Sequence, residues 1–120
     1  MTGELPAQRD GLGPLVLVVR EDEVDAAAVQ VEAVAEQVKG LTLLKGIESD
    51  ILEDGSVVYP DRVLEQLDVV IGSIHQRYGQ DEDAMTRRVL KAFDNPHLMI
   101  WGHPTGRLIN RREAVPLRIE

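Results

Sequence analysis

Short aliphatic runs alternate with helical segments along most of the chain, and this alternation restricts the fold more than any other sequence feature. The runs with the length of buried strands cover residues 15–19, 41–47, 69–74 and 98–101, and residues 117–119 begin one more. Strands that alternate with helices at this rhythm predict right-handed β-α-β units, and therefore an α/β fold with a parallel sheet. A closed β/α barrel needs about eight strands. The chain therefore predicts an open sheet, part of a larger barrel, or a subunit completed by pairing.

The helices between these runs are marked by apolar spacing and by their ends. The first opens on the acidic residues 21–23 and ends at Gly40. A short second helix covers residues 60–67, since Pro60 suits a first helical position. The third follows residue 83 and stops at Asn95-Pro96. We expect the apolar faces of the first and third helices to consist of Val24, Ala27, Ala28, Val31, Val34 and Val38, and of Met85, Val89, Ala92 and Phe93.

The 120-residue length and the 43% hydrophobic content predict a single domain. Residues 1–13 mix Gly, Pro and charges without periodicity, so we expect a disordered leader followed by one domain over residues 14–120. The absence of cysteine excludes disulfides and thiol catalysis, and leaves His and carboxylates as the metal ligands. No apolar run approaches the roughly 20 residues that span a bilayer, and no signal peptide is recognisable. We therefore expect no membrane partner and a cytoplasmic location.

The charge distribution is uneven. A formal net charge of -8 argues against broad nucleic-acid binding, which depends on neutralising phosphates with Lys and Arg. The segment after His103 is nevertheless basic, because it carries Arg107, Arg111, Arg112 and Arg118 against Glu113 and Glu120. This segment is either a solvated surface loop or a cationic rim beside an anionic substrate.

Three metal-binding side chains follow three successive predicted strands. Glu48 ends the run 43–47, His75 ends the run 69–74 and His103 follows residues 99–102, with spacings of 27 and 28 residues. One β-α unit separates each pair, so all three should reach the carboxyl edge of the sheet, where α/β folds place their sites. Two imidazoles and a carboxylate suit a divalent transition metal and leave positions for water and substrate. His97 follows Asn95-Pro96 at the opposite edge, and we interpret it as a surface residue.

The segments around these positions also carry motifs of a known family. From about residue 22 onward the chain resembles the PHP domain that follows the polymerase in bacterial family X DNA polymerases. The most specific motif is Gly102-His103-Pro104-Thr105-Gly106-Arg107-Leu108. The supporting motifs are residues 45–56, Tyr59-Pro60-Asp61, Ser73-Ile74-His75 and Arg111-Arg112-Glu113.

This resemblance implies a distorted, TIM-like β/α barrel with a multinuclear manganese or zinc site that hydrolyses phosphoesters. In the polymerases the activity is 3′-5′ exonuclease or 3′-phosphatase trimming of DNA ends, which links the family to DNA repair. By the same resemblance, Glu48 would bind and bridge metals, His75 and His103 would each bind one metal, and Arg107 would contact a phosphate. The implied substrate is a DNA 3′ end or a small phosphate ester.

Some ligand motifs of the family do not occur in this sequence. A His-x-His strand, an Asp-His pair and a distal Asp-x-His are absent, and the run 15–19 continues into Arg20-Glu21 where Asp-His is expected. Two other functions therefore stay open. One is a catalytically inactive PHP remnant, acting as a structural or homo-oligomeric module through exposed sheet edges. The other is a DNA-binding fragment that uses the loop from Arg107 to Arg112.

Overall fold

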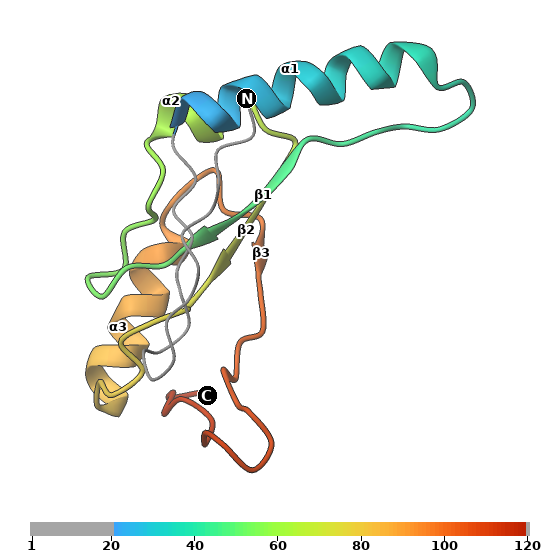
Figure 1. The fold of residues 1–120 in the computed structure, drawn as a ribbon. Helices are drawn as coiled ribbons and strands as arrows, with labels where there is room; N and C mark the ends of the chain where they lie inside the picture. The colour runs from blue at the N-terminus through green and yellow to red at the C-terminus, as the bar shows by residue number, and fades with distance from the viewer. Residues whose placement is uncertain (1–20, 120) are drawn as a thin grey trace.

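A three-stranded parallel sheet with flanking helices makes up the part of the chain, residues 21–119, that the computed structural model describes (Figure 1). The strands are paired in the order β1-β2-β3, and Gly46 lies opposite Val69 while Gly72 lies opposite Trp101. The predicted parallel α/β arrangement is therefore confirmed. The predicted leader 1–13 and strand 15–19 lie outside the described residues. The elements are α1 (Glu21–Gln37), β1 (Gly46–Asp50), α2 (Asp61–Leu64), β2 (Val69–Ser73), α3 (Glu82–Phe93) and β3 (Ile100–Trp101).

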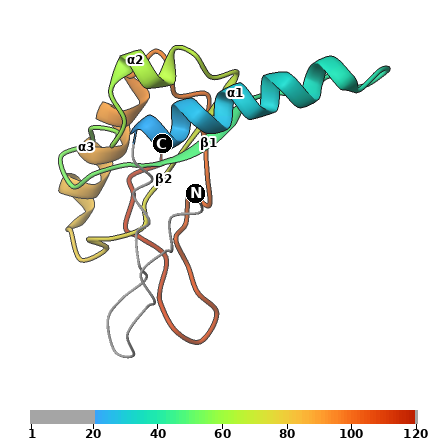
Figure 2. The ribbon, with the colours of Figure 1, turned by 45° about the horizontal axis from the view of Figure 1, so that its top comes forward.

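Both crossover helices lie on the same side of the sheet (Figures 1 and 2). Side chains alternate between the two faces of a strand. Val70 of β2 packs with α2, and Ile51 and Ile74, just beyond β1 and β2, pack with α3. One face of the sheet is therefore covered by helices, and the residues between these positions point to the other face. The buried core consists of Val24, Ala28, Tyr59, Val63, Leu64 and Val70 around α2, and of Ile51, Ile74, Met85, Val89, Ala92 and Val115 around α3.

Arg88 is the largest fully buried side chain and joins the two segments that leave β1 and β2. Its guanidinium donates to the carbonyl oxygens of Ile51 and Leu52 on one side. On the other side it donates to the carbonyl oxygens of Gln76 and Arg77 and to the side-chain oxygen of Gln80. A guanidinium has five N–H donors, so all of them are used. From α3, Arg88 therefore links the segments that follow β1 and β2 at the carboxyl edge of the sheet.

Several predicted strand boundaries were wrong. The first strand of the described region starts at Gly46 and not at residue 41, because the preceding segment has no neighbouring strand and exposes Leu41 (65%) and Leu44 (59%). The strand predicted over 98–101 is reduced to Ile100–Trp101. Residues 117–119 form no strand, because this segment lies on α3, where Arg118 N–H donates to Thr86 Oγ1 at 3.1 Å.

Three helix predictions also need correction. The helix expected over 60–67 is a single turn at Asp61–Leu64 that follows Pro60, and the chain then turns towards β2 through a hydrogen bond from Leu67 N–H to Leu64 O. On α3, Phe93 is not in the core but 49% exposed, with its ring edge-on to Trp101 at 5.4 Å. The apolar stripe of α1 is buried only at Val24 and Ala28; Ala27 beside them is exposed, and Val34 is exposed because the helix extends beyond the sheet (Figure 1). Within residues 21–119, no helix combines the length and apolarity needed to cross a membrane.

Candidate metal centre

Glu48, His75 and His103 come together on the face of the sheet opposite α2 and α3. His75 and His103 each lie two residues beyond the end of their strand, as their positions in the sequence suggested. Glu48 differs, because it is the third residue of the five in β1 and not at its end. The imidazoles of His75 and His103 therefore extend back over the face of the sheet to meet the Glu48 carboxylate.

The three ligand atoms form a small triangle. His75 Nε2 and His103 Nε2 each lie 3.0 Å from Glu48 Oε1, and the two nitrogens are 3.2 Å apart. Atoms that bind one ion at about 2.1 Å, with angles between about 90° and 110°, are about 3.0–3.4 Å from one another. The triangle therefore has the size that one divalent ion requires. The donor set of two imidazoles and a carboxylate also suits such an ion.

Electrostatics at Glu48 favour its charged form. The neighbouring Ser73 hydroxyl is the main cause of a lowered pKa of Glu48, partial burial opposes it, and the imidazoles of His103 and His75 lower it further. The hydroxyl approaches the carboxylate without the geometry of a full hydrogen bond, so we attribute its effect to its dipole. A lowered pKa keeps the carboxylate available as a metal ligand near neutral pH.

The backbone at His103 is unusual. Its φ is +27°, outside the regions that side-chain-bearing residues favour. The preceding Gly102 has no room for a side chain, because a Cβ there would overlap the Ser73 hydroxyl and lie 2.9 Å from Ile71 Cγ2. Strained backbone of this kind gathers at functional sites. Here it turns the His103 imidazole back over the sheet edge towards Glu48.

A groove of about 550 Å³ opens beside the two histidines and is bordered by the arginine-rich loop. Arg107, the predicted phosphate contact, lines this groove together with Arg111 and Arg112. Arg112 is fixed, because it donates to Gly106 O at 2.7 Å and stacks 3.6 Å above the ring of Tyr78. Arg107 and Arg111 are exposed, and within residues 21–119 no carboxylate pairs with either. Their charges are free to attract an anion.

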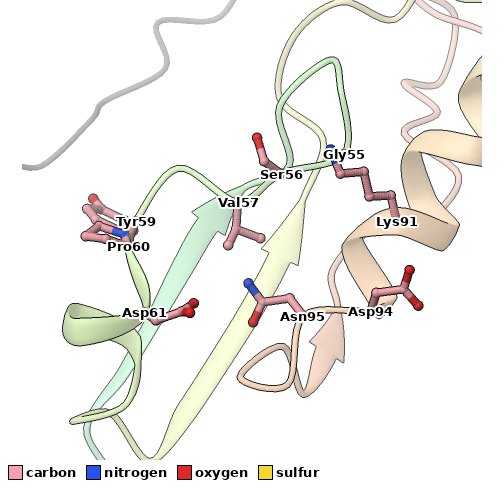
Figure 3. Close-up of a pocket in the computed structure, with 9 residues that line it drawn as sticks. All are labelled: Gly55, Ser56, Val57, Tyr59, Pro60, Asp61, Lys91, Asp94 and Asn95. Carbon is pink, nitrogen blue, oxygen red and sulfur yellow. The ribbon is translucent and has the colours of Figure 1, made fainter.

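A second hollow, of about 540 Å³, lies between α2, the loop after β1 and the end of α3 (Figure 3). Its charged side chains are Asp61, Lys91 and Asp94, and Figure 3 shows them spaced around its rim. No histidine lines it, and it contains no cluster of metal-binding groups. We therefore place the candidate site at the sheet edge, around Glu48, His75 and His103. His97 lies away from this site, with its Nε2 4.0 Å from Oδ1 of Asp61, which lines the second hollow.

Asp50 and Ser73 adjoin the candidate site but were not singled out from the sequence. Asp50 is buried, and its Oδ1 contacts His75 Nδ1. Alternation along a strand was a usable signal, because Asp50 lies two residues after Glu48 and must share its face. For Ser73, the equivalent signal was its place two residues before His75.

Comparison with known proteins supports the predicted relationship. No protein-family model matches the chain. It is 41% identical over 93 residues to the DNA polymerase/3′-5′ exonuclease PolX of Bacillus subtilis, a match that covers 78% of this chain and 16% of that protein. It is 35% identical over 77 residues to a probable phosphatase of Caldanaerobacter subterraneus, covering 61% of this chain and 30% of the relative. A probable phosphatase of Syntrophotalea carbinolica is 40% identical over 68 residues, 54% of this chain and 28% of the relative.

The chain thus spans less than a third of the length of each of these relatives. The similarity relates this segment to proteins named for phosphatase and family X polymerase functions.

Proposed function

We propose that this chain carries part of a metal-dependent phosphoesterase centre of the PHP type, with Glu48, His75 and His103 as ligands to a divalent ion. The observation that carries the proposal is the 3.0–3.2 Å triangle of their ligand atoms. Manganese and zinc are the ions that this donor set favours. When bound, such an ion would lower the pKa of a water towards neutrality and polarise a phosphoryl oxygen.

The chain's own residues divide the remaining tasks. Glu48 would supply a negatively charged ligand to the ion, and the imidazoles of His75 and His103 would supply two neutral ligands. Arg107 and Arg111 border the adjoining groove and would bind a phosphate oxygen there. The substrate is a phosphate ester, either a small molecule or a DNA 3′ end. The names of the relatives, phosphatase and 3′-5′ exonuclease, support both.

We also propose that the sheet is a segment of a PHP-type barrel. Two features support this arrangement: α2 and α3 cover one face only, and the metal-binding side chains lie on the other. Barrels of β/α units have the same division between an outer helical layer and an inner face.

Metal binding provides the first test. Zn²⁺ or Mn²⁺ should raise the Tm of the purified chain, because a ligand that binds only the folded state stabilises it. At a free metal concentration about 100 times Kd the gain is about 2.7 kcal/mol. His75→Ala should abolish the shift. His97→Ala is the matched control, because it removes the remaining imidazole at a position remote from the triangle.

Hydrolysis provides the second test. The metal-loaded chain should hydrolyse a chromogenic phosphodiester, and His75→Ala should lose this activity while His97→Ala keeps it. Arg107→Ala should raise KM for the same substrate without changing the Zn²⁺ affinity. Wild-type protein that binds no metal, or that binds metal without turnover above the blank, would contradict the phosphoesterase function.

The alternative, an inactive self-association module, is favoured by the unpaired edges of the described sheet. β1 and β3 are both unpaired on their outer sides within the described sheet, and Met99 and Ile100 are exposed beside β3. Exposed strand edges invite pairing with a second chain. A metal-free dimer in sedimentation experiments would support this alternative, and a metal-loaded monomer would exclude it.

A further inference from the structure

A buried carboxylate lies directly behind one of the proposed metal ligands. Asp50 is 7% exposed, and its Oδ1 contacts Nδ1 of His75. The other nitrogen of the same ring, Nε2, is the atom that faces Glu48 and His103. The imidazole therefore joins a buried acid on one side to the ligand triangle on the other.

Among residues 21–119, His75 is the one side chain that forms a hydrogen bond or ion pair with the Asp50 carboxylate. The buried guanidinium of Arg88 acts on Asp50 through its charge alone, because its five donors are occupied by four carbonyl oxygens and Gln80. Oδ2 of Asp50 has no hydrogen-bond partner among residues 21–119, and neither does the buried hydroxyl of Ser73, which is paired with Asp50 across the sheet.

Burial of a carboxylate oxygen without a hydrogen-bond donor costs free energy. A simple structural role would be filled better by an apolar side chain. His75 is the one side chain in the described part of the chain that hydrogen-bonds to the Asp50 carboxylate, so we look for the reason for its burial in what it does to that ring.

We propose that Asp50 is a positioning residue that holds His75 in the tautomer with a proton on Nδ1 and a lone pair on Nε2. A carboxylate can only accept a hydrogen bond, so it selects the ring form that donates from Nδ1. The lone pair on Nε2 then points at the centre of the ligand triangle. Carboxylates that act on metal-binding histidines in this way fix the ring and raise its basicity. The inference rests on the proposed metal site. Without an ion, Glu48 Oε1, 3.0 Å from Nε2, would favour a proton on Nε2 just as Asp50 favours one on Nδ1, so the stated tautomer belongs to the metal-bound ring.

The hydrogen bond is measurable in the Zn²⁺-loaded protein. Long-range ¹⁵N–¹H NMR spectra of the full chain at pH 8 show which ring nitrogen carries the proton, and the exchange of that proton with water reports its partner. We expect a slowly exchanging proton on Nδ1 of His75 in the wild type and faster exchange in Asp50→Ala. A wild-type Nδ1 proton that exchanges as fast as in Asp50→Ala would overturn the proposal.

Metal affinity is the second readout. Loss of a partner of this kind typically weakens binding by about 10–100-fold, and we expect that reduction in Zn²⁺ affinity for Asp50→Ala. Asp94→Asn is the control, because Asp94 is exposed at the end of α3, and this variant should bind Zn²⁺ like the wild type. Unchanged affinity in Asp50→Ala would also overturn the proposal.

A nearly isosteric variant guards against misfolding. Asp50→Asn keeps the shape of the side chain, but its amide can either accept from Nδ1–H or donate to a bare Nδ1, so the bias towards one tautomer is lost. We expect faster exchange of the Nδ1 proton and an intermediate affinity, and wild-type behaviour in both would count against the role. A wild-type chain that binds no Zn²⁺ refutes the proposed metal site, whereas a chain that binds Zn²⁺ equally well with and without the Asp50 carboxylate refutes only the role of Asp50.

Discussion

Replacing Arg88 by methionine should destabilise the chain more than any surface substitution on the same helix. Methionine preserves much of the side-chain length but removes all five donors. The carbonyl oxygens of Ile51, Leu52, Gln76 and Arg77 would each lose a charged partner, while Gln80 could turn towards water. The segments that follow β1 and β2, next to Glu48 and His75, would then lose their hydrogen bonds to α3.

The magnitude follows from the burial of these contacts. A buried carbonyl left without a partner costs about 1–3 kcal/mol. Of the five contacts, only the one to Ile51 is fully buried, so water can reach the others once the guanidinium is gone. We therefore expect a loss of about 3–5 kcal/mol, from one full penalty at Ile51 O and smaller penalties at the other three carbonyl oxygens. For a domain of this size the Tm should fall by more than about 12 °C.

Urea denaturation followed by the fluorescence of Trp101 is the appropriate assay, since the chain has a single tryptophan. Arg87→Met, which removes an exposed arginine from the adjacent position, is the matched control and should stay within about 0.5 kcal/mol of the wild type. Arg88→Lys keeps the charge but has only three donors, so about half of the loss should remain. An Arg88→Met variant as stable as Arg87→Met would refute the stabilising role of the Arg88 hydrogen bonds.

Three further perturbations test other parts of the description. Asp81→Ala should cost about 1 kcal/mol in urea denaturation, because the Asp81 side chain caps α3 by accepting from Ala84 N–H at 2.8 Å. Gly102→Ala should weaken Zn²⁺ binding and lower the Tm, because its Cβ would collide with Ser73 and Ile71; unchanged values would contradict the close approach of β3 to β2. Asp54→Asn should lower stability at neutral pH but not at acid pH. The Ser56 hydroxyl lowers the pKa of Asp54 from its ordinary value of 3.8, so the charged form stabilises the fold above that pH, and the contribution disappears as the pH falls through the lowered pKa. Urea denaturation at pH 7 and pH 2 should therefore show the variant less stable than the wild type only at the higher pH.

Local patterns predicted the order of the elements in the described region and some of the helix ends. The acidic opening of α1 and the Asn95-Pro96 stop after α3 are signals that depend on neighbouring residues alone, whereas α1 ends at Gln37, three residues before the predicted Gly40. Strand boundaries were less predictable, because a strand exists only where a partner strand is present. Leu41 to Leu44 have strand-like composition but no partner in the described sheet, so they stay outside β1.

The proximity of Glu48, His75 and His103 follows from the chain alone, since parallel β-α units bring residues one unit apart to the same edge of a sheet. The environment of each residue depends on contacts across the fold that no spacing encodes. Arg88 reaches the carbonyl oxygen of Ile51, 37 positions earlier in the chain, and Asp50 meets His75, 25 positions later. A buried arginine or aspartate resembles an exposed one in sequence, because its partners are main-chain atoms or a ring brought close by packing. The proximity of the three side chains was therefore predictable from the order of residues. The contacts of Asp50 and Arg88 that surround them form only when the strands pair and α3 packs against the sheet.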